Sequence, residues 1–217
     1  FKEASDKAGE ADALRLIVNC HRLKELHDEA TEKANTEIAR FKGEGNKRGE
    51  ASMMLSLAEI QLTRDQESEA LTTLSEALTI FKDVGDKKMQ ATVLLVTSSV
   101  HATKEDAVEA LQTANEALAL FTEIGDKKGQ GRAHLAAGAA HLVGDAYDEG
   151  AESAKSALTC FKEASDRKME IAALDLSAQA MLMKEKPQAA LETATQALSV
   201  AREIGYARGE ALATTTM

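Results

Sequence analysis

Residues 121–130 read Phe-Thr-Glu-Ile-Gly-Asp-Lys-Lys-Gly-Gln, and closely similar decapeptides recur along the chain every 40 residues. Five of them open with phenylalanine: Phe1, Phe41, Phe81, Phe121 and Phe161. Ala201 takes the next place in the series, and no insertion disturbs the register over the 217 residues. Self-similarity at such a period indicates one small structural unit that is repeated along the chain.

Each unit is predicted to contain two helices. Gly125 is expected to adopt the left-handed conformation that ends a helix, and Asp126 to cap the next one. A first helix then runs from about Lys128 to Val143, and after a break at Gly144-Asp145 a second runs to about Ala164. The other units offer residues for the same two roles: Gly45, Gly85, Gly205, Ser5 and Ser165 for the first, Asp6, Asn46, Asp86 and Asp166 for the second.

The second helix of each unit carries small residues one heptad apart, which let two helices approach closely. The first of these positions holds Ala30, Ala70, Ala110, Gly150 and Ala190, and the second holds Glu37, Ala77, Ala117, Ala157 and Ala197. Pro187, the single proline of the chain, falls at the start of the fifth second helix. Proline is well tolerated in the first turn of a helix, so the position of Pro187 supports the predicted start of this helix.

The composition fits a soluble, folded protein and excludes several classes. The chain has 26 basic and 36 acidic residues, hence a net charge of −10, and 44% of its residues are hydrophobic. An acidic balance argues against nucleic acid as a partner, because such binding depends on neutralising phosphates. No apolar run approaches the length of about 18 residues typical of a membrane span, so direct membrane insertion is not expected.

The two cysteines, Cys20 and Cys160, are too few and too far apart for a disulfide framework. Two free thiols suit a reducing compartment such as the cytoplasm. No signal peptide is visible, but the chain begins at Phe1 inside the repeat pattern. We therefore expect the true N-terminus to be missing, which leaves an organelle open as the location.

The repeat resembles the tetratricopeptide repeat. The resemblance is carried by Gly-Asp-Lys-Lys-Gly-Gln at 125–130, by Ala-His-Leu-Ala-Ala-Gly-Ala-Ala-His-Leu-Val-Gly-Asp-Ala-Tyr at 133–147, and by Ala-Glu-Ser-Ala-Lys-Ser-Ala-Leu at 151–158. The 40-residue period exceeds the basic 34 residues and resembles the long repeats of cell-polarity adaptors and kinesin light chains. The family pattern is incomplete, since its first-helix glycine survives only as Gly138.

The resemblance implies an all-α fold, a right-handed superhelical solenoid of antiparallel helix pairs. It covers the whole chain as a single array, 1–217, with five full repeats at about 7–46, 47–86, 87–126, 127–166 and 167–206 and a partial sixth at 207–217. Neither end carries the polar helix that normally caps such an array. We therefore expect the chain to be a segment of a longer array, or its ends to dock onto something.

By the same resemblance, the first helices line an inner groove that could hold a partner helix or an extended segment. The candidate groove residues are Arg15, Asn19, Leu55, Leu62, Leu95, Leu135, Leu142, Asp175 and Leu182. The alternative is that these leucines pack against the second helices. The set of lysine and asparagine residues that grips chaperone carboxyl termini is incomplete, so binding of such tails is not expected.

A row of cations in the turns forms a candidate charged edge. Its members are Lys87, Lys88, Lys127, Lys128, Arg167 and Lys168. Such a row could meet an acidic partner or an anionic surface. The alternative is a solvated edge whose charge is balanced by nearby Asp and Glu residues.

Neither metal binding nor catalysis is expected. His21, His101 and His141 share one position of the first helix, but equivalent positions lie about 8–10 Å apart, whereas zinc needs nitrogen ligands at about 2.0–2.1 Å. The chain also lacks a phosphate-binding loop, a dinucleotide-binding glycine turn and a nucleophile elbow. We expect no cofactor and no enzymatic activity.

The sequence thus favours a non-catalytic scaffold or adaptor that binds other proteins. One alternative is a structural or peripheral subunit that stabilises a large multiprotein assembly, in an organelle or at a membrane. Another is a regulatory array attached to a catalytic domain outside this segment. In each case we expect proteins, and not nucleic acid, as partners.

Overall fold

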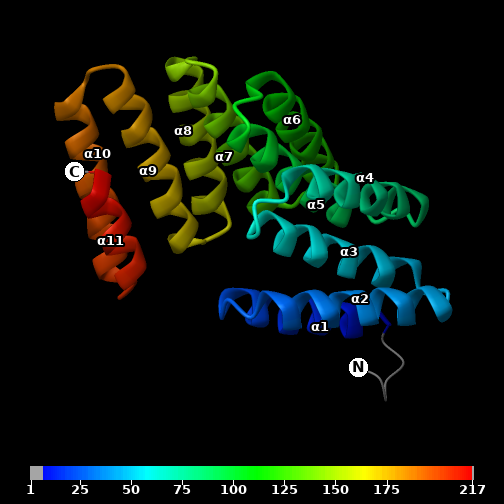
Figure 1. The fold of residues 1–217 in the computed structure, drawn as a ribbon. Coiled ribbons are helices and arrows are strands. Elements are labelled where there is room, and N and C mark those ends of the chain that lie inside the picture. The colour runs from blue at the N-terminus through cyan, green and yellow to red at the C-terminus, as the bar shows by residue number, and fades with distance from the viewer. Residues whose placement is uncertain (1–6, 217) are drawn as a thin grey trace. The chain divides into compact units, whose positions relative to one another are not determined.

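The computed structural model describes residues 7–216, which form eleven α-helices joined by loops of three or four residues (Figure 1). The helices are α1 (Lys7–Leu23), α2 (His27–Gly43), α3 (Lys47–Leu62), α4 (Glu67–Asp83), α5 (Lys87–Thr103), α6 (Ala107–Glu123), α7 (Lys127–Val143), α8 (Tyr147–Glu163), α9 (Arg167–Met183), α10 (Pro187–Glu203) and α11 (Ala207–Thr216). The predicted all-α class and two helices per 40-residue repeat are confirmed. No helix in this part of the chain is both long and apolar enough to cross a membrane.

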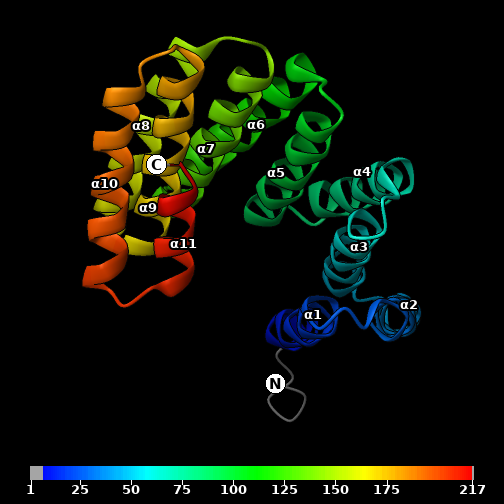
Figure 2. The same ribbon diagram turned by 60° about the vertical axis from the view of Figure 1, so that its left-hand side comes forward.

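The chain divides into two compact units, residues 1–100 and residues 101–217. In the first unit α1 and α2 both pack against α3, and α3 pairs with α4. In the second unit α7 pairs with α8 and α9 with α10, while α8 packs on α9 and α11 packs on α9 and α10 (Figure 2). Within the two units, α3, α9 and α11 each pack on both helices of the pair before them, as in a TPR-like solenoid. That all repeats form one array stays a prediction.

The turns between repeats have the predicted backbone. Gly125 has a φ of 69°, and the Asp126 amide donates to the Phe121 carbonyl at 2.9 Å while the Gly125 amide donates to Thr122 at 3.1 Å. This pair of bonds is a Schellman motif. Asp126 Oδ1 then accepts from the Gly129 amide at 2.9 Å and caps α7. The corresponding roles are confirmed for Gly45, Gly85, Ser165, Gly205, Asn46, Asp86 and Asp166, while Ser5 and Asp6 lie outside the described residues.

The core follows the predicted repeat. Phe41, Phe81, Phe121 and Phe161 are almost completely buried, and Phe1 lies outside the described residues. In the first unit Phe81 and Leu74 of α4 pack with Met89 and Val93 of α5. The small residues of the second helices are buried, so the helices approach closely there. Pro187 begins α10, as predicted.

Candidate functional site

Several cations of the predicted charged edge form ion pairs with carboxylates of their own repeat. Lys128 Nζ lies 2.5 Å from Asp166 Oδ2, and Lys127 Nζ lies 3.0 Å from Glu163 Oε2. Further pairs join Arg167 to Glu170 and Glu203, the Lys168 ammonium lies 5.2 Å from the Tyr206 ring centre, and Lys87 and Lys88 also have partners. The charges of Lys127, Lys128 and Arg167 are therefore balanced by carboxylates inside the molecule, and the role of this edge toward an acidic partner stays a prediction.

The leucines of the predicted groove lie at different depths. Leu55, Leu95 and Leu142 are buried, Leu62 and Leu135 are half-buried, and Leu182 is 44% exposed. Leu55 shares a cluster with Leu74 and Phe81 of α4, and Leu142 shares one with Ala154 of α8. Leu55 and Leu142 thus pack with second helices. Binding of a partner along these first helices stays a prediction.

The polar residues of the predicted groove bond to neighbouring helices or within their own. Arg15 Nη2 lies 2.8 Å from Glu59 Oε1 on α3. Asn19 Oδ1 accepts from Arg22 Nε at 3.2 Å. The buried Asp175 accepts hydrogen bonds from Gln179 Nε2 at 2.7 Å and from the Thr216 hydroxyl. These contacts occupy the side chains, and their predicted role in partner binding remains untested.

An exposed apolar surface, which the sequence analysis did not single out, lies along α1 and the loop after it. The exposed fractions are 66% for Leu16, 46% for Ile17, 73% for Leu23 and 39% for Leu26, and the free Cys20 thiol is exposed beside them. We call Leu16, Ile17, Cys20, Leu23 and Leu26 the α1 surface. Contiguous apolar exposure of this kind marks interaction sites, whereas scattered exposed leucines are ordinary.

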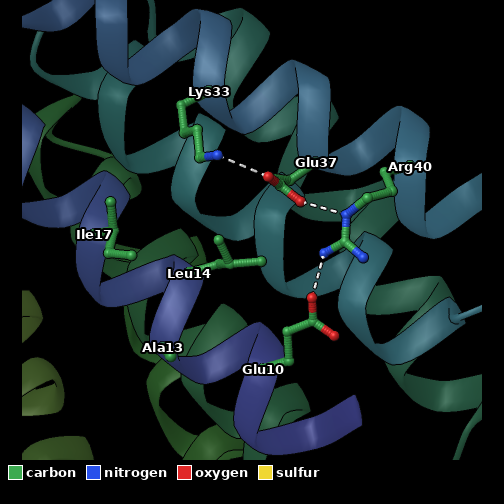
Figure 3. A pocket seen from close by; sticks show the side chains of 7 residues that line it. All are labelled: Glu10, Ala13, Leu14, Ile17, Lys33, Glu37 and Arg40. Carbon is green, nitrogen blue, oxygen red and sulfur yellow. Dashed lines mark hydrogen bonds and ion pairs between the residues drawn. The ribbon is translucent and has the colours of Figure 1, made fainter. Parts of the chain in front are cut away.

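Two hollows meet at Ile17 of the α1 surface. One, of about 300 Å³, lies between α1 and α2 and is lined by Glu10, Ala13, Leu14, Ile17, Lys33, Glu37 and Arg40 (Figure 3). The other, of about 240 Å³, is lined by Leu16, Ile17, Cys20, His21, Lys24 and Leu26. The second hollow lies on the α1 surface itself, and the first lies beside it, toward α2. A partner's side chains could fill both hollows.

A chain of ion pairs closes the α2 side of the first hollow (Figure 3). Glu37 accepts from Lys33 Nζ at 2.8 Å and from Arg40 Nε at 2.7 Å, and Arg40 Nη2 reaches Glu10 at 2.8 Å. Burial raises the pKa of the Glu37 carboxyl, but the hydrogen bonds from Lys33 and Arg40 outweigh it, so the pKa is lowered overall. Glu37 therefore stays ionised, at a helix position where the later repeats have alanine.

The histidines take part in local contacts. His21 Nδ1 lies 3.4 Å from Glu29 Oε2, and His101 Nδ1 lies 3.5 Å from Asp106 Oδ2. Within residues 7–216 no group of three His, Cys, Asp or Glu side chains could hold a metal ion. The site offers apolar contact area with a charged rim, which is suited to binding a protein surface.

Comparisons with known proteins support the fold. No family model matches the sequence, and no curated protein matches it either. Among solved structures, the chain is similar to a STAND ATPase with a tetratricopeptide repeat sensor from Pyrococcus horikoshii, with a TM-score of 0.76 and 15% identity over 99% of this chain. It spans 33% of the length of that ATPase.

Two further structures agree. The nearly identical TPR-like repeats of a kinesin light chain from Podosopora anserina match with a TM-score of 0.72 and 12% identity, over 90% of this chain and 96% of that one. BtubC from P. vanneervenii matches with a TM-score of 0.76 and 12% identity, over 89% of this chain and 80% of that one. The chain therefore has a TPR-like repeat fold, as the sequence resemblance predicts.

Proposed function

We propose that this chain is a non-catalytic scaffold that binds other proteins, with the α1 surface as a contact site. TPR-like repeat folds are typically protein–protein interaction modules, and their arrays are generally non-catalytic. The observation that carries the proposal is the α1 surface itself, where Leu16 and Leu23 are 66% and 73% exposed on one helix. A patch of large apolar side chains with a charged rim resembles the centre of a protein interface.

The energetics of such a contact are favourable. Complete burial of one leucine or isoleucine side chain contributes about 1.5–3 kcal/mol. The α1 surface offers several such side chains, and the hollows beside Ile17 give a partner's side chains places to enter. The rim charges, among them Lys24 and Lys33, then favour one orientation of the partner over others.

Two other roles remain as alternatives to a reversible adaptor. In a structural subunit of a large assembly, the α1 surface would be a permanent contact. In a regulatory array, the chain would act on a catalytic domain outside this segment, and a repeat sensor attached to an ATPase is what the Pyrococcus horikoshii structure contains. A partner that persists through size-exclusion chromatography favours the first alternative, and a catalytic motif in the same open reading frame favours the second.

The test is a comparison of bound partners. The tagged chain and its Leu16→Asp/Leu23→Asp variant are purified from cells of the source organism at low salt, and co-purifying proteins are quantified by mass spectrometry. The matched control is Val108→Asp, because Val108 is an apolar residue of α6 that is 74% exposed. We expect a stoichiometric partner that the α1 variant loses and the control keeps. Equal recovery of all partners by the three proteins would remove the α1 surface from the proposal.

A further inference from the structure

Helix α7 has a low intrinsic tendency to be helical. It contains three glycines, Gly129, Gly131 and Gly138, whereas no other helix within residues 7–216 contains more than one. A glycine inside a helix makes helix formation about fivefold less favourable than an alanine does, because more backbone freedom is lost. The helix also begins with Lys127 and Lys128, at the end of the helix dipole that disfavours positive charge. Packing against neighbours must therefore stabilise α7.

Each glycine of α7 receives a bulky side chain from a different neighbouring helix. A Cβ added to the glycine would lie only 2.2–2.6 Å from that side chain, in the pairs Gly129 with Phe121 of α6, Gly131 with Phe161 of α8, and Gly138 with Leu176 of α9. Among the buried residues of α7 itself, only Leu142 is larger than alanine. The neighbours thus supply most of the large side chains at these contacts.

Two ion pairs hold the first turn of α7, but they contribute little. Lys127 pairs with Glu163 at the end of α8, and Lys128 pairs with Asp166 in the turn that follows. Both lysine side chains are more than half exposed, so these pairs are weak and are screened further by salt. The stability of α7 therefore depends mainly on the three bulky side chains of its neighbours.

Helix α7 is also the connection between two parts of the second unit. Among the helices that the structure describes in this unit, α6 packs on α7 and on no later helix. In contrast, α8 packs on α9, and α9 packs on α10, so these helices keep those contacts when α7 is not folded. Opening of α7 would thus separate α6 from the helices that follow.

We propose that α7 is a conditional helix, which opens as one unit while α8, α9 and α10 stay folded, and which thereby uncouples α6 from them. Local openings of this kind occur where a segment contributes few buried apolar contacts of its own. The inference concerns the second unit and does not depend on the α1 surface.

The opening has a consequence for partner binding. In the closed state the rings of Phe121 and Phe161 are almost completely buried. In the open state both rings lose the helix that covers them, and the two parts of the unit can change their orientation. A partner that contacts α6 and α8 together therefore favours the closed state, and one that binds the rings favours the open state.

Native-state hydrogen exchange of the full chain, read by mass spectrometry, is the first experiment. The matched comparison is α9, which occupies the same place in the next repeat and contains no glycine. We expect the amides of α7 to exchange about tenfold or more faster than those of α9. Equal protection of the two helices would overturn the inference.

A urea series shows whether α7 opens alone. The urea dependence of exchange reports how much surface an opening exposes. We expect a small dependence for α7 and a larger one for α8, α9 and α10, which exchange through opening of the whole unit. The same dependence in all four helices would mean that α7 opens only together with them, which is the opposite of the proposal.

An exchange of side-chain sizes tests the mechanism. Phe161→Leu removes the part of the ring that lies over Gly131, and Gly131→Ala fills that space and favours the helix. We expect each single variant to speed exchange in α7 by about tenfold, and the double variant to exchange more slowly than either. The matched control is Phe81→Leu, which alters the corresponding ring of the first unit and leaves exchange in α7 unchanged.

The double variant decides between two outcomes, once circular dichroism shows that all variants are folded. Slower exchange than in either single variant supports the contact as the support of α7. Additive losses would show that the contact between Phe161 and Gly131 does not hold α7 closed, and the inference would be overturned.

Discussion

At the scale of single residues, the loops inside each helix pair hold acidic residues in a left-handed backbone conformation. Glu105 has a φ of 62°, Asp145 of 58° and Glu185 of 55°. The left-handed region disfavours side chains with a Cβ, by roughly 1–2 kcal/mol. Glycine fills the matching position in most loops between repeats. These acidic residues therefore lower the free energy of unfolding, compared with glycine at the same positions.

The first prediction follows from this strain. Glu105→Gly removes the strained Cβ, although glycine also gains freedom in the unfolded chain. We expect the free energy of unfolding to rise by up to about 1 kcal/mol, measured by urea denaturation. The reverse change at the equivalent kind of position, Gly125→Ala, is expected to lower it by a similar amount. A stabilising Gly125→Ala would contradict this account.

The second prediction concerns the buried carboxylate Glu37. Its pKa in the folded protein is below the ordinary value of 4.5, so its contribution to stability is present above about that pH. The contribution is lost as the pH falls from there through the lower, folded-state pKa. The free energy of unfolding of the wild type should therefore fall more steeply with decreasing pH than that of Glu37→Gln, which has no such titration. If the free energies of unfolding of the two proteins had the same pH dependence, the predicted contribution of Glu37 would be refuted.

At the scale of helices, a second helix packs closely against the next first helix where the first helix has a glycine. A Cβ on Gly129 of α7 would lie 2.2 Å from Phe121 Cδ1, and the Phe121 ring is buried. This close approach anchors α6 to the start of α7. The contact between α6 and α7 thus requires a residue without a side chain at position 129, and not merely an apolar one.

The third prediction is that Gly129→Ala destabilises the second unit by about 1–3 kcal/mol, because overpacking displaces the ring. The control is Gly43→Ala, also in a helix, where a Cβ would meet nothing within 4 Å. Thermal denaturation should show a lower Tm for the first variant and an unchanged or higher Tm for the second. Equal effects of the two substitutions would mean that the contact with Phe121 carries little energy.

The helices could be predicted well from the sequence because the residues at their ends determine where each helix stops and the next begins. Gly125 and Asp126 mark a turn through backbone conformation and side-chain capping, which depend on few neighbours. The left-handed Glu105 carries no such signal, because glutamate is not a residue typical of that conformation, although its turn has the same two backbone hydrogen bonds as the turn at Gly125. The depth of Leu55 was equally ambiguous, because a helical wheel places a residue on a face without saying which neighbour covers that face.

The α1 surface was missed for a related reason. Leu16 and Ile17 look like ordinary core residues when α1 is considered alone. Their exposure becomes visible only in the folded chain, where Leu176, at the repeat position of Leu16, is buried with Leu142 and Ala154.

At the scale of the whole molecule, the described helices within each of the two units contact only helices of the same or the adjacent pair, so disturbances should stay local. Arg48 joins successive first helices of the first unit, with Nη1 3.3 Å from Asp12 of α1 and Nε 2.8 Å from Asp86 at the start of α5. The fourth prediction is that Arg48→Gln speeds amide hydrogen exchange in α1 and α3, and leaves α8 to α10 unchanged. The variant should also lose part of the wild type's sensitivity to salt. A uniform rise in exchange over all helices would contradict the nearest-neighbour account.

The loops of nearly constant length have a consequence for how such a gene can change. One residue added inside a helix turns everything after it by about 100° around the helix axis, and the Ala and Phe stripes would then face water. A duplication or deletion of 40 codons keeps every later residue in phase, because it begins and ends at the same point of a Schellman turn. Copying errors of whole repeats are therefore the changes in length that such a gene survives, and a lineage would vary in the number of repeats before it varies in their length.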